Sequence, residues 1–132
     1  MLKDFTQKEK KRFSFIARLR STNHAVRGLR VFFVTQHNAW VHLFVALLVV
    51  VLGVLLRISH IEWLSLVVAI SLVLIAEMIN TAFEIDIDLT SPEYHPYAKD
   101  TKDVAAGFVL LSVVFALIIG GIIFIPKLLP LI

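Results

Sequence analysis

A chain of 132 residues suffices for one small domain, but 58% of its residues are hydrophobic and its mean hydropathy is +0.85, which excludes an ordinary soluble domain. Lipid must cover the surplus of apolar surface. The absence of cysteine excludes disulfides, a thiol nucleophile and a thiolate metal site. The net charge of +3 is unevenly spread, because nine of the thirteen lysines and arginines precede Val31.

Residues 1–38 form a basic N-terminal segment that predicts an amphipathic surface helix. A cleaved signal peptide is not expected, because the basic region is long and no compact apolar run follows it closely. Apolar residues recur at helical spacing between basic ones, at Phe13, Ile16, Leu19, Val26, Leu29 and Phe33. This pattern is typical of a helix that lies in the membrane interface. For residues 1–20, a simple electrostatic anchor to anionic lipid is the alternative.

Three transmembrane helices are predicted over 39–56, 63–85 and 104–125, so the expected fold is an all-α integral membrane protein with one domain over 1–132. The second reaches the roughly 20 residues that a spanning helix needs only if Glu77 is included. The third is expected to stop at Pro126. The basic N-terminal end is expected in the cytoplasm, because Lys and Arg favour that side. Segment 86–103 is then a cytoplasmic loop.

An acidic stripe marks the end of the second span. At about 100° per residue, Glu77, Asn80, Glu84 and Asp88 project from one side of a helix, within a face about 80° wide. Intramembrane carboxylates are costly and usually face a protein interior or a water-filled cavity. Such a row suits a magnesium ion, and Glu77, the deepest, suits proton abstraction from a lipid hydroxyl. The spacing alone is equally compatible with ion transport.

The inner loop adds caps and cations. Ser91 is expected to be a helix N-cap, with Pro92 at the first helical position. Further on, Lys102 could meet a phosphate group, whereas Lys99 and Asp100 are interpreted as a solvated pair. A base, a metal carboxylate and a phosphate lysine together indicate a phosphoryl-transfer site. The glycine loops of soluble kinases are absent from the sequence.

Several motifs resemble one known family. They are "GLR" at 28–30, "AEMINTAFE" at 76–84, "PEYHP" at 92–96 and "KDVAAG" at 102–107. They are similar to the small prokaryotic diacylglycerol kinases, which include the undecaprenol kinases of Gram-positive bacteria. The resemblance implies a homotrimer in the bacterial cytoplasmic membrane, with one surface helix and three transmembrane helices per subunit and sites shared between subunits. The implied activity is transfer of the γ-phosphate of MgATP to a lipid alcohol.

The resemblance also implies roles for individual residues. Glu77 would be the catalytic base and Glu84 a magnesium ligand, with Asn80 and Asp88 supporting the site. The residues that would contact the nucleotide are Glu93, Tyr94, His95, Lys102 and Asp103, and His24 stands where some members carry a nucleotide-facing aromatic residue.

Gln36 departs from the family pattern, because members often carry an acidic residue there that joins Glu84 in binding the metal. An amide oxygen can coordinate magnesium without contributing charge, so either the metal is held more weakly or another acid compensates. Gln36 is therefore a candidate metal and nucleotide residue. The flanking His37 and His42 are poor magnesium ligands when neutral.

The lipid substrate stays open between undecaprenol and diacylglycerol, although the motifs resemble the undecaprenol kinase branch more. A catalytically weakened member that serves as a membrane binding or assembly protein is one alternative. A cation-conducting bundle is the other, but the first and third predicted spans carry no acidic residue to support it.

Overall fold

The computed structural model describes residues 15–131, with side chains from 20 to 130, and all its regular structure is helical. The elements are α1 (Phe15–Thr35), α2 (His37–Leu55), α3 (His60–Thr90), α4 (Pro96–Leu128) and a 3-10 turn (Leu129–Leu131). The expected all-α class is confirmed. The chain divides into two units between Val31 and Phe32, and each is considered by itself.

The helix expected in the N-terminal segment corresponds to α1. Its side chains from Arg20 to Val31 are exposed, including those of Val26 and Leu29. The first part of the predicted amphipathic pattern, Phe13 and the side chains of Ile16 and Leu19, lies outside the described residues, as does the basic tail before it. A location in the membrane interface stays a prediction.

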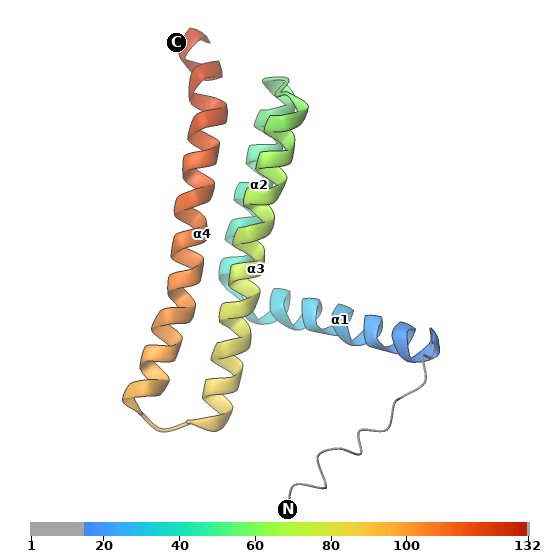
Figure 1. Ribbon diagram of the computed structural model, residues 1–132, viewed down its shortest axis with the longest axis vertical. Coiled ribbons are helices and arrows are strands. Elements are labelled where there is room, and N and C mark those ends of the chain that lie inside the picture. The colour runs from blue at the N-terminus through green and yellow to red at the C-terminus, as the bar shows by residue number, and fades with distance from the viewer. Residues whose placement is uncertain (1–14, 132) are drawn as a thin grey trace, which may run out of the picture. The chain divides into compact units, whose positions relative to one another are not determined.

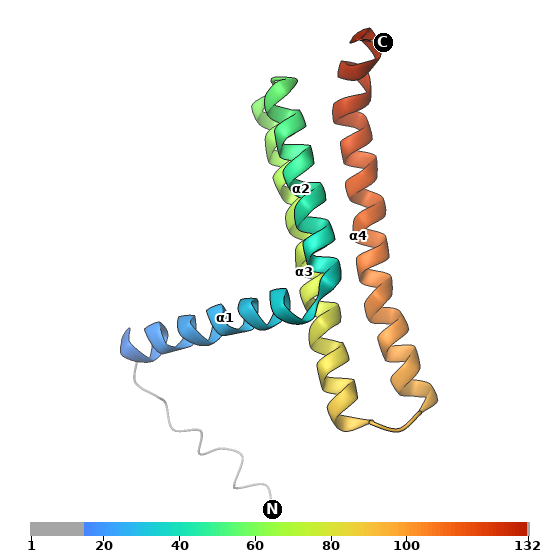
Figure 2. The same ribbon diagram turned by 180° about the vertical axis from the view of Figure 1, so that it is seen from behind.

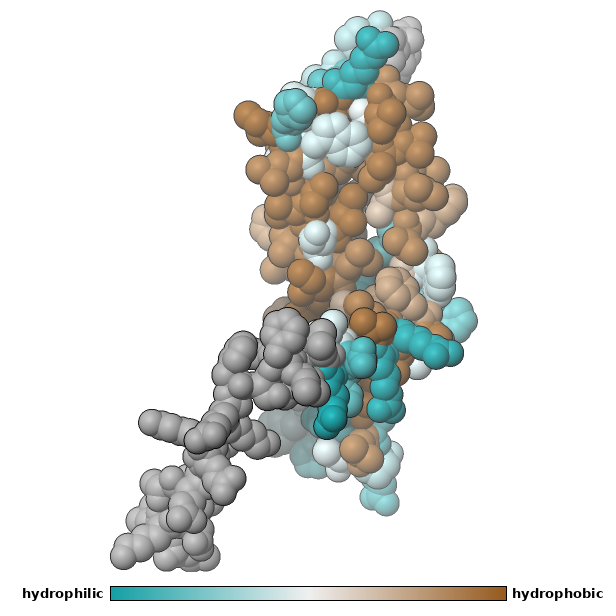
Figure 3. Space-filling view, turned by 90° about the vertical axis from the view of Figure 1, so that its right-hand side faces the viewer, coloured by the Kyte–Doolittle hydropathy of each residue, from teal (hydrophilic) through white to brown (hydrophobic). Residues whose placement is uncertain are grey.

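Helices α2, α3 and α4 are each long and apolar enough to cross a membrane, and they correspond to the three predicted spans. Helices α3 and α4 run side by side in opposite directions, and α2 packs against α3 (Figures 1 and 2). On the face seen in Figure 3, apolar side chains cover the middle of these helices and polar side chains gather at the end that carries the C-terminus. This banding suits a protein with lipid around its middle.

The corner between α2 and α3 is closed by backbone hydrogen bonds. Arg57 adopts a left-handed conformation with φ of 48°. Its N–H donates to the carbonyl of Val54 at 3.2 Å, and the N–H of Ile58 donates to the carbonyl of Gly53 at 3.1 Å. This is a Schellman C-cap, which usually places glycine where Arg57 stands. The chain therefore reverses direction within a few residues.

Helix α3 begins with a capping box. The N–H of Ser59 donates to Glu62 Oε2 at 2.6 Å, and the N–H of Glu62 donates to Ser59 Oγ at 3.4 Å. The other oxygen of Glu62 lies 3.2 Å from Lys127 Nζ. The start of α3 is thereby tied to the end of α4.

The buried core lies near this same end of the three helices. Ile58, Leu66, Ile123 and Phe124 form a buried cluster, and neighbouring apolar side chains pack around it. Gly53 permits this packing, because a Cβ there would lie 3.0 Å from both Trp63 and Ile58 side-chain atoms.

Two expectations at the other end of the helices are wrong. Segment 86–103 is mostly helical, because α3 continues to Thr90 and α4 begins at Pro96. Ser91 is the C-cap of α3, and the N-cap of α4 is His95, whose Nδ1 accepts from the N–H of Tyr97 at 3.3 Å. The physical reason is that "PEYHP" holds two prolines: Pro92 follows the end of α3, whereas Pro96 provides the first residue of α4, where no N–H is needed.

The third predicted span was expected to stop at Pro126, but α4 continues to Leu128. A proline in the last turn removes only one hydrogen bond, so the helix can extend past it by a few residues.

Candidate active site

The acidic stripe passes from buried to exposed along α3. The exposed fraction is 2% for Glu77 and 8% for Asn80, whereas Glu84 is half-buried and Asp88 is exposed. Among the described residues, Glu77 is the only carboxylate that the protein buries. A buried carboxylate needs a polar partner, because desolvating an unpaired charge is very costly.

The partner of Glu77 comes from α2. His42 Nε2 lies 2.9 Å from Glu77 Oε1, and the His42 side chain is 23% exposed. The contact joins two helices across 35 residues of sequence. Sequence reasoning missed this role, because it considered His42 as a poor magnesium ligand near Gln36 and not as a partner of Glu77. The signal that could have found it is the occurrence of an ionisable side chain inside an apolar span, which itself suggests function.

Two amides hold the carboxylate of Glu84. Asn80 Nδ2 donates to Glu84 Oε1 at 2.9 Å, and Gln36 Nε2 donates to Glu84 Oε2 at 2.9 Å. Gln36 is the N-cap residue of α2, so the end of that helix sits against the middle of the stripe. Three residues singled out from the sequence, which are 48 positions apart at their extremes, are thus brought together.

The cluster leaves one oxygen without a partner. Asn80 Oδ1 is buried and makes no hydrogen bond, although it belongs to the amide that contacts Glu84. An unpaired buried acceptor beside a carboxylate suits a cation with oxygen ligands. Among the described residues, no three His, Asp or Glu side chains gather into a metal site. The carboxylate of Glu84 and the oxygen of Asn80 fit the donors of magnesium, which takes one or two carboxylates and fills its shell with water and phosphate oxygens.

A second group of candidates surrounds a cavity at the connection between α3 and α4. The cavity has a volume of about 360 Å³. Its lining includes all the nucleotide candidates of this region together with Asp88, namely Glu93, Tyr94, His95, Lys102 and Asp103. Lys102 Nζ donates to Asp88 Oδ1 at 2.5 Å, which joins α4 to the exposed end of the stripe.

Lys99 lies at the same cavity and pairs with Asp103 instead of Asp100. Its Nζ is 2.5 Å from Asp103 Oδ2, one helical turn further along α4, and both side chains are about 60% exposed. The sequence predicted a solvated pair of Lys99 and Asp100. Lys99 is solvated, but its partner is Asp103, because residues four apart face each other on a helix. Such an exposed pair contributes little to stability.

His24 is exposed on α1, in the other unit of the chain, and its role at the nucleotide stays a prediction. The described residues thus form two polar groups on one three-helix unit: the buried one around Glu77 and Glu84, and the open one around Lys102.

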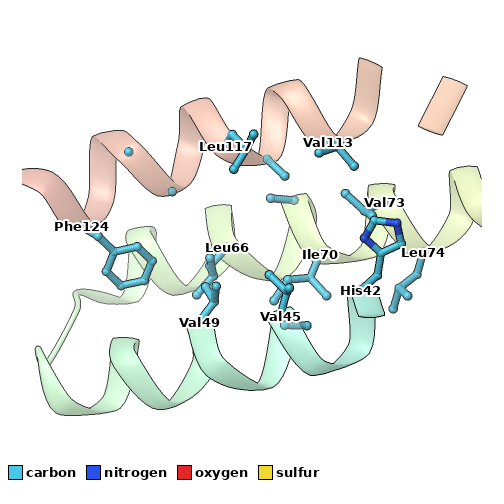
Figure 4. A pocket seen from close by; sticks show the side chains of 15 residues that line it. His42, Val45, Val49, Leu66, Ile70, Val73, Leu74, Val113, Leu117 and Phe124 are labelled. Carbon is cyan, nitrogen blue, oxygen red and sulfur yellow. The ribbon is translucent and has the colours of Figure 1, made fainter. Parts of the chain in front are cut away.

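A largely apolar cavity of about 340 Å³ also lies between α2, α3 and α4 (Figure 4). Its lining is apolar except for His42, which stands at one end, opposite Phe124. Three apolar helices, a buried carboxylate and a charged cavity at one end define a multi-pass membrane protein with a polar site suited to catalysis.

Comparison with known proteins narrows this class. Residues 23–124 match the family described as prokaryotic diacylglycerol kinase. An undecaprenol kinase of Bacillus subtilis is 40% identical over 105 residues, which cover 80% of this chain and 85% of the relative. A diacylglycerol kinase of Synechocystis is 40% identical over 112 residues, which cover 84% of this chain and 64% of the relative. The diacylglycerol kinase of Escherichia coli K12 is 27% identical over 100 residues, which cover 76% of this chain and 82% of the relative.

The chain belongs to the prokaryotic diacylglycerol kinase family and is a lipid kinase. The family implies that it uses ATP and a lipid substrate. The resemblance stated from the motifs is thereby confirmed.

Proposed function

We propose that this protein transfers the γ-phosphate of MgATP to the hydroxyl of undecaprenol or diacylglycerol at the cytoplasmic surface of the bacterial membrane. The observation that carries the proposal is the buried carboxylate of Glu77, in an apolar helix of a lipid kinase, two turns from Glu84. Such a group is costly to keep and has an evident use where a lipid hydroxyl must lose its proton.

Glu77 acts as the general base in this proposal. Its carboxylate takes the proton of the lipid hydroxyl while that oxygen bonds to the γ-phosphorus of ATP, and the bond from the γ-phosphorus to ADP breaks. Its burial excludes water, which would otherwise compete as the phosphoryl acceptor. Asn80 and Asp88 support the site, Asn80 by holding Glu84 and Asp88 by holding Lys102.

The cavity near Lys102 is the proposed nucleotide site. Lys102 offers a positive charge to the phosphates, and Asp88 restrains its side chain until the nucleotide competes for it. Glu93, Tyr94, His95 and Asp103 line the same cavity and would contact the rest of the nucleotide. We include His24, on α1, among the nucleotide contacts on the strength of the family resemblance alone.

Glu84 and the amide oxygens of Asn80 and Gln36 would hold the magnesium ion. The bound ion would neutralise charge on the phosphate oxygens during transfer. For Gln36 to contribute its oxygen, its amide must turn, because its nitrogen now donates to Glu84. A second candidate function is that of a family member with weakened catalysis. The hydrogen bond from Gln36 to Glu84 favours it, since Gln36 brings no negative charge to the metal.

We propose that residues 1–132 work as one lipid-kinase domain within a homotrimer whose sites are shared between subunits. Neither of the two cavities described above is lined by Glu77 or Glu84. A neighbouring subunit could join the nucleotide cavity of one chain to the base of another. Mixed trimers of Glu77→Gln and Lys102→Met subunits test this, because they regain activity only if one site draws on two chains.

The lipid substrate is tested by measuring magnesium-dependent transfer of labelled phosphate from ATP to undecaprenol and to diacylglycerol in mixed micelles. Wild-type protein and the Glu77→Gln variant are compared under identical conditions. Transfer to one lipid that is lost in the variant supports the proposal and identifies the substrate. If the wild-type protein binds ATP as an intact trimer but transfers phosphate to neither lipid, the weakened-member candidate is favoured.

A further inference from the structure

Glu77 is held by a side chain to which neither the sequence motifs nor the proposed mechanism assigns a part. The side chain of Glu77 is 3% exposed, and among the described residues its carboxylate forms a hydrogen bond with His42 Nε2 at 2.9 Å. The histidine stands on α2 and the glutamate on α3. Since helices in a packed bundle hold their side chains at fixed separations, this contact sets the position of the carboxylate across the bundle.

Among the groups around the pair, His42 is the residue that can hold the carboxylate of Glu77 in position. On α3, Glu84 is engaged by Asn80 and Gln36. On α4, the stretch from Val104 to Pro126 contains no titratable side chain. On α2, His37 is exposed and lies more than one turn from His42. Within the described part of the chain, Glu77 therefore depends on one imidazole for a charge-assisted hydrogen bond.

The geometry also divides the work between the two carboxylate oxygens. Oε1 faces the imidazole, so Oε2 is the oxygen left to accept a proton from a substrate. A neutral imidazole protonated on Nε2 and an imidazolium can both donate this hydrogen bond. A general base must be held within hydrogen-bond reach of the proton that it removes, and a carboxylate without its partner could rotate away.

His42 also faces the apolar cavity. It is the polar residue of that lining, and its ring lies at the end near Val73 (Figure 4). An apolar chain that enters the cavity would therefore meet the imidazole and, beyond it, the carboxylate. The pair of His42 and Glu77 therefore lies where the apolar chain of a lipid alcohol would end and its hydroxyl group begin.

We propose that His42 is a positioning residue that holds the Glu77 carboxylate through Nε2 and directs its second oxygen to the lipid hydroxyl. The inference rests on the proposed role of Glu77 as the base. It predicts that a donor at position 42 is needed, but that the imidazole ring itself is not. Glutamine can supply an amide N–H there, whereas leucine keeps the bulk of the side chain without any donor.

The experiment compares His42→Leu, His42→Gln and Glu77→Gln with the wild-type protein in mixed micelles, with His60→Gln as the matched control. His60 is exposed at the opposite end of α3 from the proposed site. We expect His42→Leu to lower kcat by about 10- to 100-fold, the range for losing one hydrogen bond to a charged group. His42→Gln should stay within about fivefold of wild type, and His60→Gln should be unchanged. The KM for ATP should change less than about twofold in all of them, because the nucleotide cavity is elsewhere.

Three results would overturn the inference. They are an unchanged kcat in His42→Leu, an equal loss in His42→Leu and His42→Gln, and a rise in the KM for ATP parallel to the loss of kcat. Elution in detergent and helical circular dichroism identify a variant that fails to fold. If His42→Leu fails to fold, the kcat of His42→Gln decides: a value within about fivefold of wild type supports the inference, and a larger loss overturns it. If Glu77→Gln keeps its rate, the base assignment fails; if it loses its rate while His42→Leu keeps it, only the role of His42 fails.

Discussion

Replacing Gln36 with glutamate tests the proposed metal site most directly. In the wild-type protein, Gln36 Nε2 donates to Glu84 Oε2 at 2.9 Å. The Gln36→Glu variant replaces this hydrogen bond with two carboxylates at nearly the same separation. Two like charges about 4 Å apart repel by about 1 kcal/mol in water and about 4 kcal/mol at the dielectric typical of a protein surface. Because both side chains are only half-buried, the metal-free variant should lose stability within this range.

A bound magnesium ion would remove that repulsion, so the variant should bind magnesium more tightly than the wild-type protein. A difference of 1 kcal/mol corresponds to about a fivefold lower magnesium concentration at half-saturation, and larger differences to more. The assay is thermal unfolding in detergent over a magnesium titration, together with the magnesium dependence of the kinase rate. Stabilisation by magnesium should be greater in the variant, because the ion binds only the folded state.

Asn38→Asp is the matched control, because it adds the same charge two residues away on an exposed side chain. If Gln36→Glu and Asn38→Asp respond to magnesium alike, Gln36 is not in the metal shell. If the Gln36→Glu protein is destabilised and magnesium does not restore it, Glu84 does not bind the ion either.

Further predictions concern the nucleotide cavity and the packing of the helices. Lys102→Met should raise the KM for ATP about tenfold, through loss of a charged contact to phosphate, while the KM for the lipid stays unchanged; an unaltered KM for ATP in steady-state kinetics would remove Lys102 from the nucleotide site. Arg57→Gly should stabilise the protein by about 1 kcal/mol in thermal unfolding, because φ of 48° is strained for arginine and costs glycine nothing; a lower stability would mean that the arginine side chain makes a more valuable contact. Gly53→Ala should destabilise it by about 1–3 kcal/mol, because the new Cβ would crowd Trp63; equal stability would show that the indole shifts freely. Gly107→Ala, where no atom lies within 4 Å of the new Cβ, is the control for that substitution.

Much of the architecture follows from local properties of the chain. Long apolar runs predict α2, α3 and α4, because a membrane requires helices of about 20 apolar residues. The acidic stripe is equally local, since residues three and four positions apart share a helix face, and Glu77, Asn80 and Glu84 do so. Family membership was also readable from the motifs around these residues, because those motifs are contiguous in sequence.

The helix ends were harder to predict. The loop expected over 86–103 contains polar residues that are compatible with helix once they lie beyond the lipid, so a loss of hydropathy does not mark the end of a helix. Two prolines four residues apart offered two possible starts for α4. In the structure α4 starts at Pro96, and α3 packs against α4 with the pair of Asp88 and Lys102 between them.

Only the tertiary structure decided which side chains meet at the site. His42 contacts Glu77 across 35 residues, and Gln36 contacts Glu84 across 48. Periodicity determines the face on which each residue lies, but it carries no information about the rotation and height at which α2 packs against α3. Because of this rotation and height, His42, which the sequence suggested only as a poor metal ligand, contacts the buried carboxylate of Glu77. For the same reason Gln36, which departs from the family pattern, donates a hydrogen bond to the proposed metal ligand Glu84.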